Sequence, residues 1–447
     1  MATANTRYPF ISSAELARRY LAFFTARGHQ EVPGAPLAAS GTDTSFVIAG
    51  MQPLLPYLRG EAPPPAPCLT DLQRCLRTDD IEAVGTNGRK ITSFQMLGNW
   101  SIGDYGPREA IALALELLDE LRLDRDSLWV TTFGGDADLG LPPDTLAVEE
   151  WRRAGIAPER IVPLGTEDNL WPPTGGPGLC GPCTEIYVDR GEAFGCGRPD
   201  CKPGCDCERF LEIWNLVFIT YELTPDGRYI PLAMRSVDTG MGLERTAAVL
   251  QNVPTVYETD LFAPGFSRLT ELAPVGGDED TRHVLARRIV VDHARAALFA
   301  GLAGVLPDRD GRGSVLRRLI RRAARQGRVL GLERPFLGEL LGPLAAAHEG
   351  LLSSEERARV PELARMVTDE ERRFTRVLTA GLRTLETLEP GPDGQVPGER
   401  LFMLHAERGF PADLAAEILV ERGLTVDWQG YERALEEHHA ISRAGLE

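Results

Sequence analysis

Apolar residues recur along the chain with two different periods, and the change between them divides the sequence into two parts. Up to residue 251, short apolar runs with strand-like spacing alternate with helical patterns. From residue 252 onward, apolar positions recur every three or four residues, as in amphipathic helices. The pattern therefore predicts an α+β domain over residues 1–251 and a helical domain over residues 252–447.

The same periodicities predict the individual elements. In the first part, the predicted strands cover residues 46–48, 93–96, 129–133 and 210–221, and the predicted helices cover residues 12–28, 108–121, 143–154 and 240–251. In the second part, the predicted helices cover residues 280–303, 315–330, 335–350 and 354–388, with a last helical unit from residue 411 to the end. The proline- and glycine-rich stretch at 389–394 predicts a turn or linker.

Composition and charge narrow the class of protein. The 447 residues are 43% hydrophobic and 25% charged, which is typical of a globular chain with two or three domains. The formal charge of −17 argues against non-specific nucleic-acid binding, although it leaves room for one local basic face. No run approaches eighteen apolar residues, and the N-terminus has no secretory pattern. We therefore expect a cytoplasmic protein with no membrane partner.

Six of the eight cysteines cluster between residues 180 and 207. Four of them, Cys196, Cys201, Cys205 and Cys207, lie within an insertion near residues 196–207 that is rich in glycine and proline. Four thiolates so close together predict a structural Zn²⁺ site, and the alternative is a surface loop with four reduced thiols. The other two cysteines belong to the separate CGPC segment at 180–183 and are interpreted as structural.

Two segments carry residue types that suit a nucleotide. In VDTGMGLER (237–245), two glycines allow close backbone approach, and Arg245 falls in the first turn of a predicted helix, where a polyphosphate can be held. Residues 73–77 and 92–99 predict an antiparallel hairpin that carries Arg77 on one strand and Phe94 with Met96 on the other. Taken alone, each segment also fits an ordinary strand–turn–helix or a solvated hairpin.

The order of these segments adds a resemblance. Nine segments follow one another: GHQ (28–30), AGM (49–51), RCLR (74–77), GRKITSFQMLGNWSIGDY (88–105), DNLW (168–171), CGPCTEIYVD (180–189), EIWNLVF (212–218), VDTGMGLER (237–245) and RGSVLRRLIRRA (312–323). In this order they resemble alanyl-tRNA synthetase, a class II aminoacyl-tRNA synthetase, over essentially the whole chain. The resemblance implies a ligase built on an antiparallel sheet flanked by helices, followed by an all-helical domain.

The resemblance also implies roles in ATP binding. Arg77 matches the arginine that contacts the α-phosphate of ATP and the amino-acid carboxylate. Arg245 matches the arginine near the adenine and the γ-phosphate, so both arginines are expected to be catalytic. Phe94 matches the residue that stacks on adenine, with Met96 beside it. The reaction consumes ATP and needs Mg²⁺, because arginines and a divalent cation stabilise charge on the transferring phosphate.

A second set of residues is implied for L-alanine. Asp238 matches the acid that pairs with the α-ammonium group of the amino acid. Trp171, Asn215, Val217 and Gly240 match residues that line a small alanine pocket. Asn215 and Val217 are two positions apart on a predicted strand, so their side chains are expected on the same face.

The sequence departs from the family at two positions that recognise the G3·U70 pair of the tRNA acceptor stem. The family's asparagine is Gly311 here, and its aspartate is Ala406. Neither side chain can hydrogen-bond a base edge.

A basic segment remains nearby, with Arg317, Arg318, Arg321, Arg322, Arg325 and Arg328. These arginines either contact phosphates or pair with carboxylates of the protein. The family's editing domain is also expected to be absent, since no HxxxH pair occurs before residue 447.

Three hypotheses follow. The first is ATP-dependent activation of L-alanine and transfer of alanyl to a small-molecule acceptor, such as a nucleoside in antibiotic biosynthesis. The second is a stand-alone alanyl-tRNA synthetase without editing that charges tRNA-Ala. The third is a catalytically inactive regulator that binds alanine or RNA. The expected oligomeric state is a monomer or weak dimer.

Overall fold

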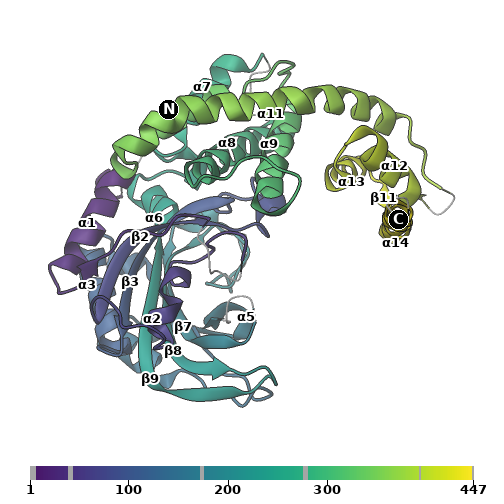
Figure 1. The fold of residues 1–447 in the computed structure, drawn as a ribbon. Helices are drawn as coiled ribbons and strands as arrows, with labels where there is room; N and C mark the ends of the chain where they lie inside the picture. Colours follow the sequence, from purple (N-terminus) through teal and green to yellow (C-terminus); the bar gives the residue numbers. More distant parts are fainter. Residues whose placement is uncertain (1–6, 39–43, 172–175, 275–279, 392–393, 445–447) are drawn as a thin grey trace.

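A nine-stranded, mostly antiparallel sheet forms the N-terminal part of the protein (Figure 1). The computed structural model describes residues 7–38, 44–171, 176–274, 280–391 and 394–444. In spatial order the strands are β1 (Gln30–Glu31), β2 (Cys68–Leu76), β3 (Ser93–Ile102), β9 (Tyr229–Gly242), β8 (Phe210–Leu223), β7 (Gly178–Asp189), β4 (Leu128–Phe133) and β5 (Ile161–Leu164), with β6 (Leu170–Trp171) paired to β7. Only the pairs at the two edges, β1 with β2 and β4 with β5, run parallel.

Helices cover one face of this sheet and leave the other face for a ligand. Helices α1 (Ser13–Thr25), α3 (Pro107–Glu120) and α6 (Leu243–Leu250) pack against the central strands. Alternation along β8 places Trp214, Leu216 and Phe218 in the core beneath these helices. The intervening residues of β8 therefore point to the opposite face. Shorter helices lie at the margins: α2 (Leu55–Leu58), α4 (Thr145–Arg153) and α5 (Thr166–Asn169).

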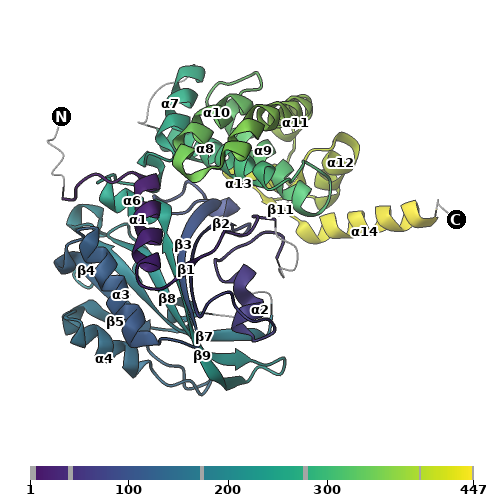
Figure 2. The same ribbon diagram turned by 60° about the vertical axis from the view of Figure 1, so that its left-hand side comes forward.

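The rest of the described chain is mainly helical. Its helices are α7 (Ala263–Leu272), α8 (Thr281–Leu302), α9 (Gly311–Val329), α10 (Gly338–Ala347), α11 (Ser354–Glu386), α12 (Gly398–Arg408), α13 (Ala412–Glu421) and α14 (Trp428–Ala444), with two short paired strands, β10 (Gln395–Val396) and β11 (Thr425–Val426). The long helix α11 runs from the sheet side of the molecule to the C-terminal helices (Figure 1). Helix α14 projects away from the body of the protein (Figure 2). The predicted α+β class, an antiparallel sheet followed by helices, is confirmed.

Three details of the predicted elements are wrong. Phe46 and Val47 are buried, but residues 46–48 form no strand, because Val47 makes single backbone bonds to Leu37 and Leu76 instead of a ladder. Residues 240–242 continue β9, where they pair with β3, so the helix begins only at Leu243. The last helical unit is two helices, α13 and α14, separated by Gly423 in a left-handed conformation and by β11. Helix α12 was not predicted.

The structure also shows whether any described helix could span a membrane. Among the helices of the described residues, none combines the length and the apolar character needed to span a bilayer.

Candidate active site

A cavity of about 350 Å³ opens on the sheet face that the helices leave uncovered. All nine residues predicted for ATP and alanine line it: Arg77, Phe94, Met96, Trp171, Asn215, Val217, Asp238, Gly240 and Arg245. They come from four strands, from the first turn of α6 and from the residue directly after β2. The structure thus brings together residues that lie up to 168 positions apart in the sequence.

Strand register explains this convergence. Val217 of β8 lies opposite Asp238 of β9, and Asn215 lies opposite Gly240. On the other side of β9, Gly242 pairs with Met96 of β3. Because side chains alternate between faces, these positions all point into the cavity while their neighbours point into the core.

One end of the cavity combines a buried acid with a close approach of backbone. Asp238 is only 6% exposed, and burial raises the pKa of its carboxyl to about 7. Removal from water favours the neutral acid, so a cationic partner would stabilise the ionised carboxylate. At Gly240, a Cβ atom would lie 2.6 Å from the sulfur of Met96, so a larger residue would require the Met96 side chain to move.

The other end holds two arginines in polar surroundings. Arg245 Nη1 forms an ion pair with Glu212 Oε2 at 2.6 Å. Arg77 Nε donates to the carbonyl oxygen of Ile48 at 3.2 Å, and its guanidinium carbon lies 4.9 Å from the centre of the Phe94 ring. Both cations are therefore held at the cavity by contacts within the protein.

Four acids that line the cavity were not among the predicted site residues: Asp80, Glu185, Glu212 and Glu244. Glu185 accepts hydrogen bonds from the Tyr187 hydroxyl at 2.6 Å and from Asn215 Nδ2 at 3.2 Å. Burial and the neighbouring Glu212 raise the pKa of Glu185 to about 8. Glu185 lies opposite Asn215 in the register between β7 and β8, which the sequence alone does not define.

The four predicted zinc ligands also come together. The sulfur atoms of Cys196, Cys201, Cys205 and Cys207 all lie within 4.8 Å of one another. The Cys196–Cys205 and Cys201–Cys207 sulfur pairs are 3.7 and 3.5 Å apart. A tetrahedral Zn²⁺ site with bonds of about 2.3 Å places its sulfurs about 3.8 Å apart, so these thiols fit zinc. By contrast, Cys180 and Cys183 are buried in β7, away from this group.

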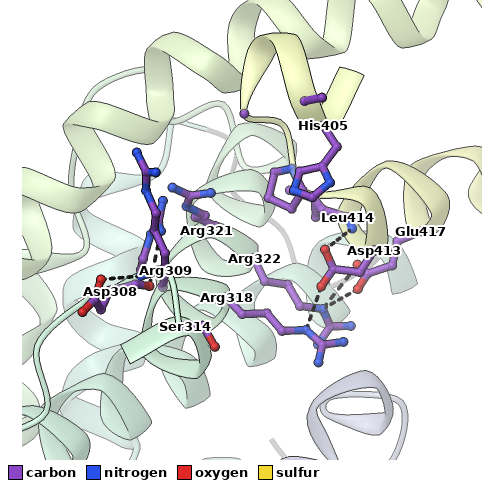
Figure 3. Close-up of a pocket in the computed structure, with 14 residues that line it drawn as sticks. Asp308, Arg309, Ser314, Arg318, Arg321, Arg322, His405, Asp413, Leu414 and Glu417 are labelled. Atoms are coloured by element: carbon purple, nitrogen blue, oxygen red, sulfur yellow. Dashed lines mark hydrogen bonds and ion pairs between the residues drawn. The ribbon is translucent and has the colours of Figure 1, made fainter. Parts of the chain in front are cut away.

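A second cavity, of about 610 Å³, lies between α9, α12 and α13 (Figure 3). We call it the arginine cleft, because Arg309 and four arginines of α9 line it: Arg317, Arg318, Arg321 and Arg322. Ala406 lines the cleft, and Gly311 is the first residue of α9. A Cβ atom at Gly311 would meet nothing within 4 Å, although the residue has a φ of +56°.

The arginines of α9 pair with carboxylates of the protein. Arg317 and Arg321 both contact Glu370 of α11, at 3.1 and 3.0 Å. Arg325 contacts Glu421 at 2.5 Å. Arg318 and Arg322 have acidic partners on α13 and in the loop between β2 and β3, which are described below. Pairing with the protein's own acids is therefore present, whereas phosphate contact stays a prediction.

Comparisons with known proteins bear directly on this arrangement. The family model described as "tRNA synthetases class II (A)" matches residues 15–447. The chain belongs to this family. It is 40% identical over 437 residues to an alanine–tRNA ligase from Acetivibrio thermocellus, covering 96% of this chain and 48% of the relative. It is 42% identical over 437 residues to the alanine–tRNA ligase of Pelotomaculum thermopropionicum, covering 96% of this chain and 49% of the relative.

The matched part of each relative is only about half of that protein. An alanine–tRNA ligase from Dehalococcoides mccartyi is 41% identical over 438 residues, or 97% of this chain and 49% of its own length. The chain thus spans about half the length of the curated relatives it matches. A solved histidine–tRNA ligase subunit from Alicyclobacillus acidocaldarius is similar over 54% of this chain and 93% of its own, at 11% identity and a TM-score of 0.31, which is too low to carry an argument.

Proposed function

We propose that this protein activates L-alanine with ATP and transfers the alanyl group to tRNA. The observation that carries the proposal is the convergence of nine expected ATP and alanine residues in one cavity, around the buried carboxyl of Asp238, whose pKa burial raises to about 7. Family membership and the names of the curated relatives support the same activity. They favour tRNA as the acceptor over the small molecule that was the first expectation from the sequence.

In this proposal Asp238 binds the α-ammonium group of alanine. A buried carboxylate and a buried ammonium stabilise each other's charged forms, which neither keeps easily alone. Trp171, Asn215, Val217 and Gly240 bound the space for the methyl group. A pocket of this kind gives about 1–3 kcal/mol of discrimination per methyl or methylene, so glycine and serine should be weak alternative substrates.

Arg77 and Arg245 act on ATP. The alanine carboxylate attacks the α-phosphorus and pyrophosphate leaves, with the negative charge spread over phosphate oxygens that the two guanidinium groups stabilise. Adenine stacks on Phe94. If it uses the face now covered by Arg77, the guanidinium must swing from the ring towards the phosphates.

The carboxylates of Glu185 and Glu212 fit Mg²⁺, because both line the cavity and offer the oxygen ligands that this ion prefers. The raised pKa of Glu185 reflects burial beside Glu212, a repulsion that a cation between them would relieve. When bound with ATP, Mg²⁺ neutralises phosphate charge. Glu212 also holds Arg245 in place beside the nucleotide end of the cavity.

A second candidate keeps the alanine activation but transfers alanyl to a small molecule, such as a nucleoside. The specific observation in its favour is that Gly311 and Ala406 offer no side-chain hydrogen bond at the arginine cleft, where the family's residues recognise an acceptor stem. The remaining α9 arginines could contact phosphates but carry no base specificity.

Two assays on the unmodified protein test these functions in order. Pyrophosphate exchange that depends on alanine is expected, and its absence would overturn the activation proposal. A minihelix with the G3·U70 acceptor stem is then offered as acceptor, with a G3·C70 minihelix as the matched control. Charging of the G3·U70 minihelix supports tRNA as the acceptor. If the G3·C70 minihelix is not charged, residues other than those at positions 311 and 406 recognise the G3·U70 pair. Exchange without charging supports the small-molecule candidate.

A further inference from the structure

The loop between β2 and β3 lies between the two cavities. This loop, residues 78–91, contributes Asp80, Arg89, Lys90 and Ile91 to the lining of the active-site cavity. Ile81 and Glu82, the residues after Asp80, contact Arg322 and Arg318 of the arginine cleft. One short segment of chain therefore touches both the nucleotide end of the active site and the arginines of α9.

Arg318 and Arg322 hold this loop through Glu82. Arg318 Nη2 forms an ion pair with Glu82, and Arg322 Nη2 lies 3.5 Å from the other carboxylate oxygen. Arg322 Nη1 also donates to the carbonyl oxygen of Ile81. The same two arginines also pair with α13: Arg318 contacts Asp413 at 2.9 Å and Arg322 contacts Glu417 at 3.2 Å (Figure 3).

The second half of the loop has separate anchors. The Tyr257 hydroxyl donates to the carbonyl oxygen of Lys90 at 2.5 Å, and Gly85 N donates to the same hydroxyl at 3.0 Å. Arg89 Nη1 donates to the carbonyl oxygen of Cys207 at 3.2 Å. Loss of the Glu82 contacts should therefore loosen the first half of the loop, around Asp80, and leave the second half in place.

The charge of the cleft suits a phosphate-bearing ligand. Five arginines and three carboxylates line it, in a chain whose formal charge is −17. Arginine pairs readily with phosphate in a bidentate geometry. Arg318 and Arg322 could engage a phosphate only by exchanging it for carboxylates that they hold now, and Glu82 is half exposed, so it is easily displaced.

We propose that phosphates of an RNA acceptor bound in the arginine cleft draw Arg318 and Arg322 away from Glu82, and that the β2–β3 loop transmits this occupancy to the ATP end of the active site. The inference rests on the proposed function for the identity of the ligand and goes beyond it in assigning Glu82 as a positioning residue. An occupied cleft should loosen the loop and weaken ATP binding.

The chain offers a matched pair of variants. Glu82→Gln and Asp413→Asn each remove one acidic partner of Arg318, and their side chains are 50% and 43% exposed. Only Glu82 belongs to the loop. In alanine-dependent exchange, Glu82→Gln should raise the KM for ATP about two- to fivefold, the range expected for exposed ion pairs, with the KM for alanine unchanged. Asp413→Asn should leave both values unchanged. Equal effects of the two variants, or no effect of Glu82→Gln, would overturn the proposal.

Hydrogen exchange of residues 78–83 gives a readout that needs no catalysis. Glu82→Gln should exchange faster there than the unmodified protein, and Asp413→Asn should not. An acceptor-stem minihelix should speed exchange in the unmodified protein and add little in Glu82→Gln, because both act on the same contacts. If the minihelix does not bind, RNA is not the ligand of the arginine cleft. If it binds without a change in the hydrogen exchange of the loop, the proposed coupling to the active site is wrong. If the loop responds but alanine exchange is absent, the proposed function fails and the coupling stands.

Discussion

Replacing Asp238 by asparagine should make the empty protein more stable and a poorer enzyme. Burial raises the pKa of this carboxyl from its ordinary value of 3.8 to about 7. Between these values the folded protein binds a proton that the unfolded chain has lost, so the free energy of unfolding falls as pH rises through this window. Each pH unit is worth about 1.4 kcal/mol, and the full cost above pH 7 is therefore about 4 kcal/mol.

Asparagine cannot ionise, so Asp238→Asn removes this cost. The variant should match the unmodified protein near pH 4 and exceed its stability by up to about 4 kcal/mol at pH 8, measured by urea unfolding at both pH values. The same change leaves the alanine ammonium without its partner. It should raise the KM for alanine roughly tenfold or more in pyrophosphate exchange, since losing a buried charge partner costs several kcal/mol.

Asp71 provides the control. It is 3% exposed on β2, and burial followed by repulsion from Asp238 raises its pKa well above the ordinary range, yet it does not line the cavity. Asp71→Asn should also gain stability relative to the unmodified protein as pH rises, with little change in the KM for alanine. An Asp238→Asn variant with an unchanged KM, or one destabilised at pH 8, would refute the assignment of this carboxylate to the substrate.

Three further predictions concern the unmodified site. The KM for alanine should fall as pH rises through about 7, because the ionised form of Asp238 that pairs with ammonium is gained in that range; a flat profile from pH 6 to 8 would contradict this. Arg77→Ala and Arg245→Ala should each slow alanine-dependent exchange roughly 100-fold, and near-normal rates in both would remove them from the phosphate site. Metal analysis should find about one Zn²⁺ per chain that is lost on replacing Cys201 and Cys207 by serine but retained on replacing Cys68, whereas four freely titratable thiols would indicate a metal-free loop.

The nine residues that meet in the cavity were predicted from the family resemblance and not from local pattern, because each segment taken alone also fits an ordinary strand–turn–helix or hairpin. Alternation alone predicted that Asn215 and Val217 share a face, and the hairpin of β2 and β3 has the predicted antiparallel pairing. The division into domains at residue 251 stays a prediction. Glu185 and Glu212 were missed because an acid beside an arginine or an amide has no periodic signal. Their importance depends on the register between β7 and β8, which places Glu185 opposite Asn215.

The arginines of α9 show where sequence reasoning must stop. Phosphate contact and pairing with carboxylates were equally open, because a helix that is rich in arginine looks the same in both cases. The deciding partner of Arg318 is Glu82, 236 residues earlier in the chain. Only the fold, which places the β2–β3 loop against α9, reveals that these cations are already paired.

The charged side chains of the two cavities therefore differ in whether they have partners within the protein, and this difference predicts how each cavity responds to its ligand. The active site keeps the buried acids Asp238 and Glu185, and burial raises their pKa values to about 7 and about 8, so a cation beside either carboxylate would stabilise its ionised form. Binding of ammonium or Mg²⁺ there adds a new charge pair. In the arginine cleft the four arginines of α9 already pair with carboxylates, so a phosphate that binds Arg318 or Arg322 must replace Glu82, Asp413 or Glu417 and gains only the difference in free energy between the two partners. Ligand binding in the active site should consequently strengthen with pH, whereas binding in the cleft should be modest in affinity and weaken with salt.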